Sequence, residues 1–140
     1  MRYVGLDLGT TSLGVSISDK TNSLVSPLVL IKFAKEDYDD ALRKLLEVIK
    51  DKNVSKIVLG LPKNMDNSMG FAVERSINFK KMLEECGYEV VLEDERLTTV
   101  EALNIMKNNG LKNINKKNKT DVLSAVLILE MYLKRISYDK

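Results

Sequence analysis

The sequence predicts an α/β fold with a mixed five-stranded sheet: three antiparallel strands, then two parallel βα units, with helices on both faces. Three observations support this prediction. Apolar residues alternate with small or polar ones near the N-terminus. Helical spacing then alternates with short β-branched runs, and the C-terminal segment is a long, apolar helical pattern. The chain length suits one domain over residues 1–140 with a single core.

The first three strands are expected to form an antiparallel meander. Arg2–Leu8 is a largely apolar run, and Ser12–Ser18 alternates strictly between apolar and small residues. The short link at 9–11 between them is typical of a hairpin. A third strand is expected at 25–33, where Pro27 indicates an edge position because proline cannot donate a hydrogen bond to a second neighbouring strand.

The remaining elements are expected to alternate between helices and strands. Gly87 and Gly110 fit the C-terminal stops of two helices. Thr120 fits the N-terminal cap of the last helix. The expected order is a helix at 38–52, a strand at 56–60, a helix at 68–86, a strand at 88–92, a helix at 98–109 and a final helix from the Thr120 cap to about 137.

Composition excludes several classes of site. The chain has no histidine, and its one cysteine, Cys86, permits no disulfide within the chain. No apolar stretch is long enough to span a bilayer, and the N-terminus lacks the pattern of a signal peptide. We therefore expect a cytoplasmic protein without a membrane partner. The net charge of +2 is too small to indicate nucleic-acid binding by itself.

Three carboxylates in apolar surroundings are the main candidates for chemistry. Asp7 lies in the first apolar strand, Glu95 follows the strand at 88–92, and Asp121 opens the last helix. Burying a carboxylate is costly unless a cation or a hydrogen-bond donor contacts it. Three carboxylates that converge would bind a hard divalent cation. Asp94 is the alternative to Glu95, because adjacent residues of an extended segment face opposite sides. For Asp121, a favourable interaction with the helix dipole is the alternative.

Three polar segments could contact phosphate. In the link at 9–11, glycine permits close backbone approach and hydroxyls can donate, although an ordinary glycine-rich turn also fits. The loop at 61–67 precedes a helix N-terminus, which receives anions well, although Asn67 or Ser68 could simply cap that helix. The segment at 111–119 contains four lysines and no acid, which fits either a solvated loop or a phosphate contact.

Three stretches, taken together, carry a family resemblance. They are GLDLG at 5–9 with Gly14 and Ser18-Asp19, GLPKNMD at 60–66 with Ser68 and Gly70, and DERLTTVEA at 94–102, with a looser match at Asp121, Ser124 and Ala125. The chain resembles the YqgF/RuvX-type family of Holliday junction resolvases, also called pre-16S rRNA nucleases, within the ribonuclease H-like fold. The resemblance extends from the first strand to the last helix.

The resemblance implies an endonuclease that hydrolyses phosphodiester bonds by a two-metal mechanism. Its substrate would be structured nucleic acid: the 5′ end of precursor 16S rRNA, in ribosome biogenesis, or a four-way DNA junction. Asp7, Glu95 and Asp121 would be the catalytic residues and the ligands of Mg²⁺ or Mn²⁺. The protein would be a monomer or a homodimer. The expected nucleic-acid contacts are Gly9, Thr10, Thr11, Ser12, Lys63, Asn64, Arg96, Lys116, Lys117 and Lys119.

Three departures from the family pattern are visible. Ser12 stands where the family usually has a basic residue, and Phe71 stands where it tends to have proline. In the family, a pair of small residues also commonly follows the last aspartate more closely than Ser124 and Ala125 follow Asp121 here. Two other hypotheses stay open on the sequence. One is a non-catalytic nucleic-acid or ribosome-associated binding module. The other is an ATP-binding domain, because the segment at 5–14 also looks like the phosphate hairpin of actin-like and sugar-kinase-like ATPases. Those ATPases close two such domains around a nucleotide, and 140 residues supply one.

Overall fold

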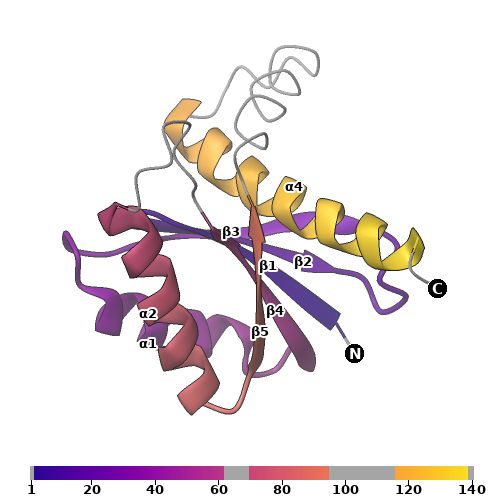
Figure 1. Cartoon of the computed structure of the whole chain (residues 1–140), viewed down its shortest axis with the longest axis horizontal. Coiled ribbons are helices and arrows are strands. Elements are labelled where there is room, and N and C mark those ends of the chain that lie inside the picture. Colours follow the sequence, from indigo (N-terminus) through magenta and orange to yellow (C-terminus); the bar gives the residue numbers. More distant parts are fainter. Residues whose placement is uncertain (1, 62–69, 95–115, 139–140) are drawn as a thin grey trace.

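A computed structural model of the chain describes residues 2–61, 70–94 and 116–138, without the side chains of 94, 116–121 and 138. A central sheet has α1 and α2 on one face and α4 on the other (Figure 1). The elements are β1 (Arg2–Leu8), β2 (Ser12–Ser18), β3 (Val25–Lys32), α1 (Tyr38–Ile49), β4 (Val54–Leu61), α2 (Phe71–Glu85), β5 (Glu89–Asp94) and α4 (Lys116–Tyr138).

The sheet has the strand order β3-β2-β1-β4-β5. β1, β2 and β3 pair antiparallel, whereas β4 and β5 run parallel to β1. The predicted mixed sheet is therefore confirmed. β3 lies at the edge, as Pro27 indicated, and the pairing with β2 shifts register between Val15 and Ser16, beside Pro27.

Alternation along β1 separates two packed layers. The even-numbered Leu6 belongs to a buried cluster that includes Leu45 of α1 and Phe79 of α2. On the other face, Val58 of β4 packs with Ile128 and other apolar residues of α4. Both sheet faces are therefore buried, which explains why β1 and β4 are apolar at successive positions.

The final helix begins earlier than its capping signal predicted. α4 starts at Lys116, so Thr120 lies inside the helix and is not its N-terminal cap. A capping residue is worth only about 1 kcal/mol, whereas a long helix is stabilised mainly by packing of its apolar face. The end of the basic segment, residues 116–119, is consequently helical and not a loop.

Other boundaries moved by a few residues. α2 begins at Phe71 with Gly70 as its N-cap, so Asn67 and Ser68 are not its caps. α1 ends at Ile49, three residues before its predicted end. β5 extends to Asp94 because its pairing with β4 continues that far. The helix expected at 98–109 lies outside the described residues. Among the helices that the structure describes, none is long and apolar enough to cross a membrane.

Candidate metal and nucleic-acid site

Asp7 is half-buried near the carboxyl end of β1, on the face that α4 covers. Its partner on β2 is Gly14. On β4, the residue level with it is Gly60, because Leu6 pairs with Leu59. With glycine at both positions, neither neighbouring strand places a side chain directly beside the carboxylate.

Helix α4 is seated on a small-residue surface next to Asp7. A Cβ added to Gly5 would lie 2.5 Å from Ser16 Oγ, 2.6 Å from the Ala125 carbonyl oxygen and 2.8 Å from Leu129 Cβ. The Ser16 hydroxyl donates a 2.7 Å hydrogen bond to that carbonyl of Ala125. Only glycine at position 5 lets the helix backbone approach the sheet this closely.

The direction of α4 sets where Asp121 lies. Tyr132 meets Tyr3, with ring centroids 6.2 Å apart, and Ala125 meets Gly5. Because position 132 pairs with the start of β1 and position 125 with its middle, α4 runs antiparallel to β1. Asp121 lies one helical turn before Ala125, about 6 Å along the axis. Asp7 lies two residues beyond Gly5, about 7 Å along the strand. Both positions therefore lie toward the carboxyl end of β1.

The described part of β5 ends at this same end of the sheet. The backbone of Asp94, the last residue of β5, pairs with Leu61 at the end of β4. Figure 1 shows α2 and α4 starting on the side of the sheet where β4 and β5 end. Glu95 lies outside the described residues. Among those described, no three histidine, cysteine or carboxylate side chains form a group that could hold a metal ion.

The position of Asp121 within α4 can be compared with its alternative role, a favourable interaction with the helix dipole. The helix begins five residues earlier and has no acidic residue in its first turn. The helix dipole acts mainly within that first turn. A dipole interaction therefore does not account for an aspartate at position 121.

The C-terminal half of α4 is held by polar contacts that the sequence reasoning missed. Lys56 Nζ donates a 3.1 Å hydrogen bond to the Tyr132 hydroxyl, and this bond raises the pKa of Lys56. Arg135 forms a 2.6 Å ion pair with Glu93, whose side chain is 7% exposed. The contacts join β4 and β5 to the helix and so fix its orientation over the sheet.

One sequence signal could have revealed the seat of α4. The alternation in β2 places glycine and serine, at 14, 16 and 18, on one face. That pattern was interpreted only as evidence for a strand. A continuous small face on a central strand also indicates that another backbone packs closely there.

The predicted phosphate contacts differ in their accessibility. Thr11 is exposed and Thr10 is half-buried at the turn, whereas Ser12 is 8% exposed. The Gly9 amide donates a 2.8 Å hydrogen bond to the Ser12 carbonyl, which closes the turn. Lys63, Asn64 and Arg96 lie outside the described residues. Of Lys116, Lys117 and Lys119, the backbone alone is described, at the start of α4.

Two further features lie away from Asp7. Asp19, part of the first family stretch, accepts hydrogen bonds from the Ser23 and Leu24 amides, and the bond from Ser23 lowers its pKa. Its carboxylate thus stabilises the turn between β2 and β3.

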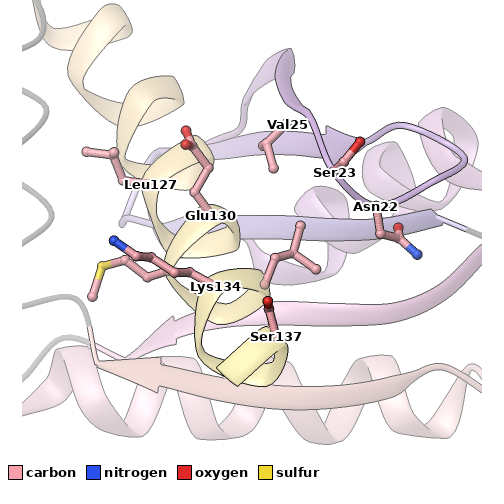
Figure 2. Close-up of a pocket in the computed structure, with 9 residues that line it drawn as sticks. Asn22, Ser23, Val25, Leu127, Glu130, Lys134 and Ser137 are labelled. Carbon is pink, nitrogen blue, oxygen red and sulfur yellow. The ribbon is translucent and has the colours of Figure 1, made fainter. Parts of the chain in front are cut away.

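A groove of about 580 Å³ separates that turn from the C-terminal half of α4, with Glu130 and Lys134 on its helical wall (Figure 2). It shares no residue with the predicted site.

Comparison with known proteins gives a consistent family. The family described as "RuvX: Holliday junction resolvase" matches residues 1–135. A Bacillus subtilis protein named "Putative pre-16S rRNA nuclease" is 42% identical over 134 residues, covering 95% of this chain and 97% of that protein. A protein of the same name from Ruminiclostridium cellulolyticum is 40% identical over 141 residues, covering 100% and 99%.

A solved structure shares the fold. Thermus thermophilus RuvC in complex with a Holliday junction substrate superposes with a TM-score of 0.62, over 97% of this chain and 96% of that one, at 16% identity. At that identity the likeness concerns the fold alone, which is the ribonuclease H-like fold expected from the sequence. The match over residues 1–135 and the identities of 40% and 42% establish the family. This chain belongs to the RuvX family of Holliday junction resolvases.

Proposed function

We propose that this chain is a divalent-metal-dependent endonuclease that cuts structured nucleic acid. Its active site would lie at the carboxyl end of β1. The observation that carries the proposal is the packing of α4 on Gly5 and Ser16, which supports a position for residue 121 toward the carboxyl end of β1, where Asp7 lies. Family membership supports phosphodiester hydrolysis as the reaction.

The residues present fit a hard divalent cation. Asp7 offers carboxylate oxygens between two glycine positions, and Asp121 would add a second carboxylate from the helix. Mg²⁺ and Mn²⁺ prefer such oxygen ligands, so the absence of histidine is no obstacle. A cation pair bound there would supply a nucleophilic water and charge relief at the leaving oxygen. The chain's part is to hold these carboxylates on the strand and on the packed helix.

Strand alternation favours Glu95 over Asp94 as the third ligand. Val91 and Glu93 of β5 face α4: Val91 packs in its apolar cluster and Glu93 pairs with Arg135. Because residues two apart on a strand share a face and adjacent residues do not, this alternation supports Glu95, two positions after Glu93, over Asp94.

The start of α4 supports a phosphate contact beside these carboxylates. Lys116, Lys117 and Lys119 occupy the first turn of the helix. Positive charge is unfavourable there because the helix dipole is positive at its N-terminus. A nucleic-acid phosphate would relieve this repulsion, and we assign the three lysines to holding the substrate backbone.

Precursor 16S rRNA is the first candidate substrate. Relatives with 40% and 42% identity over nearly their whole length carry the name of a pre-16S rRNA nuclease. A four-way DNA junction is the second candidate, favoured by the description of the family. Neither comparison favours the ATP-binding or the non-catalytic hypothesis.

A side-by-side cleavage assay tests the proposal. Precursor 16S rRNA and a four-way DNA junction are each incubated with the full chain in Mn²⁺, in Mg²⁺ and in EDTA. We expect metal-dependent cleavage of the rRNA that Asp7→Asn abolishes without loss of fold by circular dichroism. Cleavage that persists in EDTA, or equal activity of the variant, would reject the metal mechanism. Symmetric cuts in the junction alone would select the second substrate and require a dimer.

A further inference from the structure

Phe71 is an aromatic side chain that lies almost fully exposed on the surface. It is the first residue of α2 and is 88% exposed. Among the residues that the structure describes, Leu24 is the other exposed large apolar side chain, at 69%. An exposed phenylalanine contributes nothing to the core and loses the stabilisation that burial would give, about 2 kcal/mol.

The location of Phe71 connects it to the proposed cleavage site. α2 follows β4, and its first turn lies on the side of the sheet where β4 and β5 end (Figure 1). Its inward face is formed by Val73, Ser76 and Phe79, which are buried. Phe71, two residues before Val73, is therefore directed away from the core.

The charge beside Phe71 narrows the choice of partner. Glu74 lies three residues on, so it is a neighbour on the helix surface, and it is exposed. Arg75 lies four residues on, so the helix surface beside the ring carries one charge of each sign and has no net charge to attract an isolated phosphate or an anionic membrane surface. An aromatic ring next to a nuclease site can instead bind the face of an unpaired base, because every base offers a π-surface for stacking.

We propose that Phe71 is a stacking platform for an unpaired base of the substrate, beside the scissile strand. The inference rests on the proposed function, and it adds a preference for substrates with unpaired nucleotides near the cut.

Binding measurements without cleavage test this role. The full chain is titrated into labelled RNA duplexes, in buffer without Mg²⁺ or Mn²⁺, and anisotropy gives Kd. One duplex is fully paired, and the other has an unpaired nucleotide carrying 2-aminopurine. The variants are Phe71→Ala, Phe71→Leu and Phe71→Trp, with Leu24→Ala as the matched control for removal of an exposed apolar side chain. Thermal unfolding checks that each variant is folded.

We expect Phe71→Ala and Phe71→Leu to bind the RNA with the unpaired nucleotide about tenfold more weakly. Phe71→Trp and Leu24→Ala should bind like the wild type, and the fully paired duplex should not distinguish the variants. The 2-aminopurine emission should change on binding of the proteins with an aromatic ring at position 71, which are the wild type and Phe71→Trp, and not on binding of Phe71→Ala or Phe71→Leu. An unchanged Kd for Phe71→Ala, or wild-type binding by Phe71→Leu, would overturn the stacking role alone. Failure of the wild type to bind either RNA would overturn the proposed function as well.

Discussion

The hydroxyl of Ser16 in β2 donates a 2.7 Å hydrogen bond to the backbone carbonyl of Ala125 in α4. Both residues are buried, and the bond lies where Gly5 leaves room for the helix. It connects the strand hairpin that carries Asp7 to the helix that carries Asp121. The relation between two proposed metal ligands therefore depends on a contact that involves neither of them.

Gly5→Ala should disturb the close packing of α4 on β1 and β2. The new Cβ would lie within 2.8 Å of three atoms, two of them on α4, so the helix must shift outward. Overpacking of this kind costs about 1–3 kcal/mol. We expect a lower free energy of unfolding in urea and loss of cleavage. Gly9→Ala is the control for stability alone, because the nearest atom to its new Cβ would be 3.4 Å away. Equal stability of the two variants would contradict the close packing of α4 on Gly5.

Ser16→Ala should weaken the seat without crowding it. Loss of the buried hydrogen bond to Ala125 should reduce the free energy of unfolding by about 1 kcal/mol. Because position 121 would then be held less firmly, we expect kcat to fall while KM changes little. Ser26→Ala removes an exposed hydroxyl from edge strand β3 and serves as the control. Wild-type kcat and stability in Ser16→Ala would show that this bond does not position the helix.

Metal binding should be visible without any substrate. Mg²⁺ or Mn²⁺ bound to the folded state raises Tm by mass action, so we expect saturating metal to raise the wild-type Tm by several degrees. Asp7→Asn should retain its Tm in EDTA and lose the increase. Asp39→Asn, at an exposed carboxylate in α1, should keep it. A metal-induced rise of equal size in Asp7→Asn would place the bound metal elsewhere.

The choice between neighbouring carboxylates can be resolved by a pair of isosteric changes. Glu95→Gln should abolish metal-dependent cleavage, because we propose Glu95 as the third metal ligand. Asp94→Asn should retain most of the activity. Rates measured at saturating Mn²⁺ decide between them. An inactive Asp94→Asn variant beside an active Glu95→Gln variant would assign the ligand role to Asp94 instead.

The ion pair between Glu93 and Arg135 gives a prediction about stability. Arg135→Leu would remove a positive charge that neutralises a buried carboxylate, and this destabilises a protein more than removal of both charges does. We therefore expect the double variant Glu93→Leu/Arg135→Leu to unfold at higher urea concentration than Arg135→Leu alone. Because Arg135 is 55% exposed, the difference should be modest. A double variant less stable than the single one would contradict a role of Arg135 in neutralising Glu93.

Local patterns were sufficient for much of the fold. The limits of β1 and β2 agree with those predicted, and Pro27 identified the edge strand, because alternation and proline geometry are properties of neighbouring residues. Three motifs also identified the family before any comparison. The start of α4 was wrong because the Thr120 signal is weak compared with the packing that stabilises the helix.

The sequence by itself determined the mixed sheet, the family and the identity of the candidate carboxylates. Only the tertiary structure decided how the last helix lies on the sheet: α4 runs antiparallel to β1 and packs on Gly5 and Ser16, which puts the backbone of position 121 toward the carboxyl end of β1. The Ser16–Ala125 contact joins residues 109 positions apart. Periodicity reports which face a side chain takes within its own element, whereas the seating of one element on another depends on shape complementarity between distant segments.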